Sequence, residues 1–128
     1  MKNQYFLKDK KALIYVSTQL CLPGDRPKTY YIPRTPAPIW AYASQLKQDI
    51  IFEAKKYGEE ESYMFVFNRR TRAKLYDYIL YRDKWYIITR IDTKADYNTD
   101  VFIYAKDAPE GRIPDENNLR PYGWQRDY

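Results

Sequence analysis

The chain has 128 residues and a mass of 15.5 kDa, the size of one domain with a core of its own. Its 22 Lys and Arg against 17 Asp and Glu give a net charge of +5, which is compatible with contact to nucleic acid but does not by itself indicate it. The absence of histidine and the single cysteine exclude a Ser-His-Asp triad, a Cys-His pair, a His-ligated zinc and an intrachain disulfide, so the composition points away from an enzyme and predicts neither a cofactor nor a metal.

The first eleven residues are polar and lack the apolar stretch of a signal peptide. No apolar run approaches the ~20 residues of a transmembrane helix. We therefore expect a protein made and kept in a reducing cytoplasm, with no membrane partner.

Aromatic residues are abundant, with 15 Tyr, 5 Phe and 3 Trp. Tyrosine suits the half-buried surface of β-strands, and it is also enriched at protein interfaces. The aromatic content therefore favours a β-rich fold, an interaction protein, or both.

A first strand is predicted over residues 12–21, where β-branched residues are frequent. Residues 22–38 then hold five of the eight prolines. Proline lacks a backbone N–H, so this segment is predicted to be a long, stiff loop with a short extended piece at residues 30–32. We expect the loop to project from the domain as an interface element. Its candidate contact residues are Pro23, Arg26, Tyr30, Tyr31, Pro33, Arg34 and Pro36.

A second strand is predicted over residues 39–46, and a helix follows over about 46–57. Leu46, Ile50 and Tyr57 recur at helical spacing, and Gly58 is suited to cap the end of the helix. A buried strand is predicted over 62–68, where nearly every residue is apolar.

The basic link 69–74 carries four cations in six residues: Arg69, Arg70, Arg72 and Lys74. With aromatic residues on both sides, this cluster is similar to the face of a protein that binds single-stranded nucleic acid. Such clusters are more often solvated or paired with acidic surfaces. The neighbouring run of Tyr63, Phe65 and Phe67 also favours a core strand over an open stacking platform.

The clearest hairpin is predicted from residues 76–81 and 84–92, with Arg82 and Asp83 in the turn. A polar turn region at 94–99 leads to a last strand at 100–105. The apolar alternation selects one buried face. The predicted core residues are Trp40, Phe65, Ile79, Tyr86 and Ile88, with Trp85 as the alternative to Tyr86.

Residues 107–128 are predicted to form an extended tail after a single β domain at 1–106. Leu119, Tyr122 and Trp124 are its candidate anchors. These residues either fold back on the barrel of their own chain or dock on a neighbour. The elements together predict a mainly β fold, a small antiparallel barrel or sandwich with one inserted α-helix, a long Pro-rich loop and a C-terminal tail.

Residues 40–106 resemble the head-closure (head–tail joining, or stopper) proteins of long-tailed bacteriophages. The resemblance begins with Trp40-Ala41 and the Phe52-Glu53-Ala54 piece, followed by a strand that ends at Arg69-Arg70. It continues through Asp77-Tyr78-Ile79-Leu80-Tyr81 and Lys84-Trp85-Tyr86-Ile87-Ile88 to Ile91-Asp92. The sequence departs from the family in having Asp83 where a turn glycine is usual, and in its longer tail.

The resemblance implies a structural subunit of the virion neck, made in the host cytoplasm. Such a subunit forms a ring with copies of itself, closes the packaged head and offers a surface on which the tail docks. The implied partners are a portal-side adaptor, a tail-completion or tail-tube protein and, in the channel, packaged DNA. A loop such as 22–38 would then line the channel or an interface. Two alternatives stay open, a basic barrel that binds single-stranded nucleic acid and a small enzyme.

Overall fold

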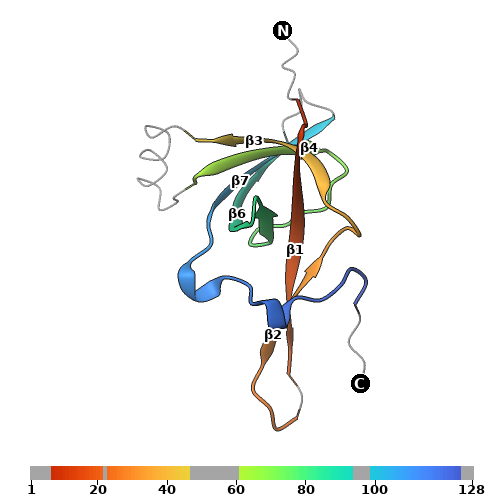
Figure 1. The fold of residues 1–128 in the computed structure, drawn as a ribbon, viewed down its shortest axis with the longest axis vertical. Helices are drawn as coiled ribbons and strands as arrows, with labels where there is room; N and C mark the ends of the chain where they lie inside the picture. The colour runs from red at the N-terminus through yellow and green to blue at the C-terminus, as the bar shows by residue number, and fades with distance from the viewer. Residues whose placement is uncertain (1–6, 22, 47–60, 94–98, 125–128) are drawn as a thin grey trace.

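The computed structural model describes residues 7–21, 23–46, 61–93 and 99–124. They form seven strands and two short 3-10 turns (Figure 1). The strands are β1 (Lys10–Leu20), β2 (Lys28–Pro33), β3 (Ile39–Gln45), β4 (Tyr63–Asn68), β5 (Tyr78–Tyr81), β6 (Lys84–Asp92) and β7 (Asp100–Asp107). The 3-10 turns are η1 (Glu110–Arg112) and η2 (Glu116–Asn118).

Six strands close into an antiparallel barrel. The neighbours run β1-β3-β4-β7-β6-β5, and β5 pairs back with β1 through Leu13–Leu80, Ile14–Ile79 and Tyr15–Tyr78. The seventh strand, β2, lies outside this ring and pairs with the second half of β1. The predicted fold class, mainly β with a small antiparallel barrel, is confirmed, and of the two architectures the closed barrel is the one found.

The barrel is filled by large side chains facing small ones. Phe65 of β4 is fully buried between Ala43 of β3 and Ile103 of β7, which are its register partners. Ala12, Ala41 and Ala105 are likewise buried and leave room for Phe67 and for the tyrosine rings of the interior. A narrow barrel accommodates aromatic residues on one strand because its neighbours contribute alanine.

Four of the five predicted core residues lie in this cluster: Phe65, Ile79, Tyr86 and Ile88. The prediction for Trp40 was wrong, because its side chain is 55% exposed. Strand β3 turns Ile39, Ala41 and Ala43 toward the core, so Trp40 points outward, where the Lys11 ammonium lies 4.6 Å from its ring. Trp40 has the opposite parity on β3 to Ile39, Ala41 and Ala43, so the alternation along the strand exposes it.

The hairpin of β5 and β6 has the predicted two-residue turn. Arg82 and Asp83 both adopt positive φ, 52° and 62°, as the type I′ turn requires. Asp83 replaces the usual glycine in a conformation that aspartate tolerates better than most residues. The hairpin begins later than predicted, because Tyr76 and Asp77 precede the strand.

The Pro-rich segment is not a loop throughout, because the extended piece predicted at residues 30–32 is part of a longer strand. Residues 28–33 form strand β2, paired with β1 from Lys28–Leu20 to Pro33–Tyr15. The five prolines lie at the ends of this stretch, and Pro33 occupies the last position of an outer strand, where a missing N–H costs no ladder hydrogen bond. The β1–β2 hairpin extends beyond the barrel in Figure 1.

The predicted helix at about 46–57 falls outside the described residues apart from Leu46, which follows the end of β3. Within the described ranges, no helix has the length and apolar character needed to cross a membrane.

Candidate interaction surfaces

The β1–β2 hairpin carries most of the predicted contact residues of segment 22–38. Pro23 and Arg26 lie exposed in its turn, where Gly24 has a φ of 85°. Tyr30, Tyr31 and Pro33 are half-buried on β2, and Pro36 is exposed just after it. These residues therefore belong to one projecting hairpin and to the short connection from that hairpin to β3.

Arg34 was predicted as a contact residue of the loop, but the structure places it in an internal ion pair. Its Nε lies 2.6 Å from Oδ2 of Asp77, and its Nη2 lies 3.2 Å from Oδ1. Asp77 is buried, and its Oδ2 also accepts a hydrogen bond from the Lys74 backbone N–H at 2.9 Å. The Arg34 N–H donates to the Ile14 carbonyl at 2.8 Å. Arg34 thus anchors the base of the hairpin to the barrel.

The tail folds back on its own chain at two of its three predicted anchors. Leu119 forms a parallel β-bridge with Tyr31, and the Trp124 ring lies 5.3 Å from the Tyr30 ring. Tyr122 is 55% exposed. Of the two alternatives considered for the tail, the described residues show the intramolecular one.

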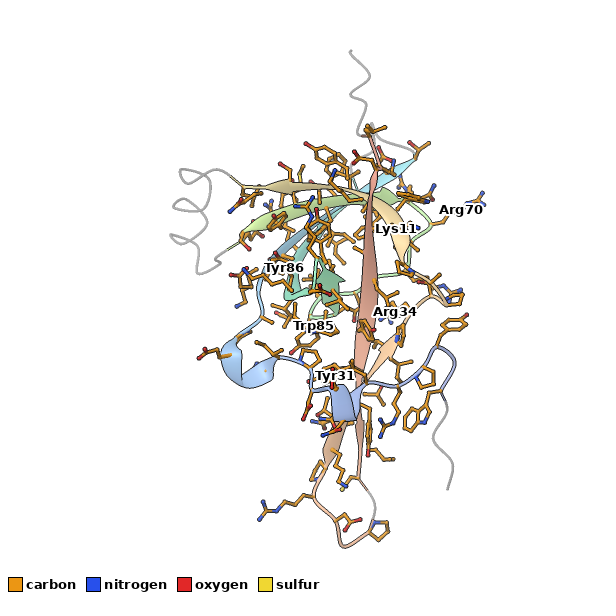
Figure 2. The ribbon with its side chains drawn as sticks, viewed as in Figure 1. Lys11, Tyr31, Arg34, Arg70, Trp85 and Tyr86 are labelled. Carbon is orange, nitrogen blue, oxygen red and sulfur yellow. The ribbon has the colours of Figure 1, made fainter. Side chains whose placement is uncertain are left out.

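A second apolar cluster lies outside the barrel and joins hairpin, barrel wall and tail. Tyr15, Tyr78 and Ile87 form its buried centre. Tyr31 packs edge-on against Tyr78 at 5.2 Å, and Trp85 against Tyr15 at 5.0 Å. Leu119 of the tail completes the cluster. Figure 2 labels two of its residues, Tyr31 and Trp85.

Burial alters the acidity of the tyrosines in both clusters. It raises the pKa of Tyr15 and of Tyr78, and it raises the pKa of Tyr86 to about 12. Loss of hydration is the largest cause in each case, because the phenolate is the form that burial disfavours. These phenols therefore stay neutral at physiological pH and act as packing groups rather than as bases.

The β4–β5 link exposes its basic residues. Arg70, Arg72 and Lys74 are exposed, and their side chains enter no ion pair within the described part of the chain. Figure 2 shows Arg70 pointing away from the ribbon. Arg69 is exposed too, and its backbone N–H donates to the Thr99 carbonyl at 2.9 Å.

Two apolar side chains follow the basic residues directly. Leu75 is 50% exposed and Tyr76 is 67% exposed. Tyr76 has a φ of 70°, an unfavourable value for a bulky residue, and a hydrogen bond from its N–H to the Ile88 carbonyl holds it there. The link therefore presents three exposed cations and an exposed aromatic ring within seven residues.

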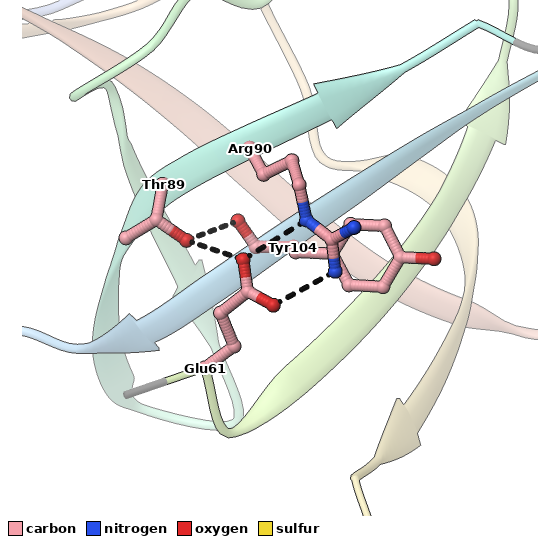
Figure 3. A network of polar contacts seen from close by, with 4 residues as sticks. All are labelled: Glu61, Thr89, Arg90 and Tyr104. Atoms are coloured by element: carbon pink, nitrogen blue, oxygen red, sulfur yellow. Dashed lines mark hydrogen bonds and ion pairs between the residues drawn. The ribbon is translucent and has the colours of Figure 1, made fainter. Parts of the chain in front are cut away.

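A buried polar group that the sequence did not predict closes the other end of β4 (Figure 3). Glu61 accepts hydrogen bonds from Nε and Nη2 of Arg90 at 3.1 and 2.8 Å, and the Thr89 hydroxyl lies 3.1 Å from the same carboxylate. The Arg90 guanidinium stacks on the Tyr104 ring at 3.8 Å. Its hydrogen bond to Glu61 raises the pKa of Arg90. Both carboxylate oxygens of Glu61 accept hydrogen bonds, so the network holds the chain before β4 against β6 and has a structural role.

A hollow of about 510 Å³ lies between the hairpin and the tail. Its polar side chains offer hydroxyl, amide and guanidinium groups but no carboxylate or thiol. The lining residues are Ser17, Gln19, Thr29, Tyr31, Tyr78, Gly111 and Arg112. Within the described ranges, no three acidic or cysteine side chains gather as metal ligands.

In comparisons with known proteins, no family model matches the chain and no curated protein matches it either. The function has to be inferred from the fold, the surfaces and the sequence pattern.

Proposed function

We propose that this protein is a structural neck subunit of a long-tailed bacteriophage, which closes the packaged head and provides the surface on which the tail docks. Its site of action would be the head–tail interface of the virion. It would work as a ring of copies between a portal-side adaptor and a tail-completion or tail-tube protein, with packaged DNA within reach of the channel. No catalytic step is part of this role.

One observation carries the proposal. The segment that resembles head-closure proteins, residues 40–106, contains β3, β4, β5, β6 and β7, and these five strands are consecutive neighbours in the barrel. Trp40-Ala41 and most of the stretch 77–92 therefore belong to one continuous sheet, which β1 closes, whereas Phe52-Glu53-Ala54 lies outside the described residues. A resemblance assembled by chance from short motifs would have no reason to coincide with one structural unit.

The surfaces are consistent with ring formation. A ring requires two different patches on each copy, one meeting the other on the next copy. The projecting β1–β2 hairpin and the exposed β4–β5 link are two such patches, and they differ in shape and charge.

The test is to examine particles from the phage that encodes this chain, assembled without it. We expect heads that package DNA but lose it and that carry no tails, by electron microscopy and by nuclease sensitivity of the packaged DNA. Supplying the wild-type chain should restore DNA retention and tail attachment. Particles that keep both without the chain would overturn the proposal.

A second candidate function is supported by the β4–β5 link. Exposed Arg70, Arg72 and Lys74 beside the exposed Tyr76 ring are the elements that a sequence-independent binder of single-stranded nucleic acid uses. The barrel core does not provide the further stacking residues, because Phe65 and Phe67 are fully buried. The link is therefore a weaker basis for a function than the five-stranded sheet.

A further inference from the structure

The end of the tail pairs with the edge of β2 that β1 does not occupy. Leu119 pairs with Tyr31 in a parallel bridge along this edge, and its side chain packs in the apolar cluster on the face that carries Tyr31. The next residue, Arg120, donates its backbone N–H to the Tyr31 carbonyl at 2.9 Å. Residues 119–124 on Tyr30 and Tyr31 form what we call the clasp. It occupies an edge that would otherwise be free to pair with another chain.

The clasp also reaches the opposite face of β2. The Arg120 guanidinium lies 4.5 Å from the Tyr30 ring and 5.6 Å from the Trp124 ring. The two rings are 5.3 Å apart. Arg120 is held in place by hydrogen bonds from its Nη1 to the carbonyls of Asn117 and Leu119, at 3.0 and 2.9 Å. Tyrosine, tryptophan and arginine are the residue types that dominate binding between separate proteins.

The segment before the clasp is anchored to the barrel at its start and self-contained at its end. Ala108 donates its N–H to the Trp85 carbonyl at 3.1 Å, and Pro114 is buried. Beyond Pro114, Asp115 caps the turn η2, and Asn118 and Leu119 donate their N–H groups back to Asp115 and Glu116. Residues 115–124 can therefore leave β2 as a unit while Pro114 stays docked.

We propose that the clasp is exchanged between copies, so that residues 119–124 of one copy occupy the β2 edge of the next copy in the assembled ring. The exchange forms the same contacts that exist within one chain, so it needs no new complementary surface. In dilute protein the tail covers its own edge, because the tether gives it a high effective concentration there. The exchange rests on the self-association contained in the proposed function.

The test uses a cross-link across the clasp in a Cys21→Ser background, which removes the exposed native cysteine. Thr29→Cys and Asn117→Cys each lie two residues before a partner of the Tyr31–Leu119 bridge. A short bismaleimide should join these positions. An equimolar mixture of the two single-cysteine variants, concentrated until the protein associates, should give a covalent dimer, because joining these positions then requires two chains.

A variant that carries both cysteines in one chain serves as the matched control, because a cross-link within that chain keeps the clasp closed. Cross-linked in dilute solution, this variant should give a monomer whose clasp cannot open, and it should fail to associate in sedimentation experiments. The same variant capped with N-ethylmaleimide should associate as the wild type does.

If the cross-linked monomer associates as strongly as the capped variant, the exchange of the clasp is overturned while the proposed function still stands. A mixture without covalent dimer up to the solubility limit would also overturn it. Covalent dimer in a protein whose absence leaves particles intact would keep exchange and refute the neck function.

Discussion

Tyr86 is the residue whose environment has the clearest consequence for stability. Its ring packs inside the barrel, 5.1 Å from Tyr63 and 5.9 Å from Phe65. Burial raises its pKa from 10.0 to about 12. Between these two values the folded protein holds a proton that the unfolded chain loses. The Tyr86 contribution is therefore fully present below pH 10 and declines as the pH rises toward 12.

We expect wild-type protein to lose up to about 2–3 kcal/mol of unfolding free energy from this residue between pH 10 and 12, from the size of the pKa shift. Tyr86→Phe keeps the ring and removes the titrating group. The variant should match wild type at neutral pH and exceed it near pH 12 in denaturant titrations. A difference between the two proteins that stays constant with pH would contradict this account.

Ile88 and Trp40 form a matched pair of truncations that tests which faces of the strands are buried. Ile88 is 0% exposed in the centre of the barrel, whereas Trp40 is 55% exposed beside Lys11. Ile88→Ala should destabilise the fold by about 2–4 kcal/mol, since it removes buried methyl groups and leaves a cavity. Trp40→Ala removes the larger side chain but should cost less than about 1 kcal/mol. Thermal and chemical unfolding would detect a reversed order, which would place Trp40 in the core.

At the scale of elements, the β5–β6 hairpin and β4 were predictable because their signals are local. Alternation along residues 84–92 and the Arg82-Asp83 turn specify both strands and their connection. The run at 63–67 is apolar at every residue, and three consecutive ones, Phe65, Val66 and Phe67, are fully buried, so a strand buried on both faces could be recognised without a period of two. Strand β2 extends the piece predicted at residues 30–32 by two residues before it and one after it, and counting prolines over 22–38 obscured the spacing that leaves residues 28–32 free to pair.

The polar anchors were not predictable from the sequence. Arg34 and Asp77 lie 43 residues apart and meet because β1 pairs with both β2 and β5. Glu61 and Arg90 are 29 residues apart and meet across β7. A run of three glutamates gives no sign that its last member is buried. Arg120 likewise gained its position in the clasp from tertiary structure, and no motif surrounds it.

At the scale of the whole molecule, positive charge is concentrated on one connection. The net charge of +5 is modest, yet the β4–β5 link places Arg69, Arg70, Arg72 and Lys74 within six residues on the surface. A neck subunit would use them for salt bridges or for phosphate contacts without sequence preference. A single-strand binder would depend on them for most of its affinity. The two functions therefore differ in how much binding free energy this link supplies on its own.

Replacing these four residues together by glutamine should leave the fold intact, because their side chains are exposed, and should impair the formation of infectious particles. The isolated wild-type protein should have little affinity for an oligonucleotide at physiological salt, since four cations and one exposed ring provide few contacts. Fluorescence anisotropy over a range of salt concentrations measures this directly. Each phosphate contact should lower log K by about 0.7 per log unit of salt on a single strand. Micromolar or tighter binding at physiological salt, lost in the glutamine variant while its unfolding curve is unchanged, would favour the nucleic-acid function over the neck.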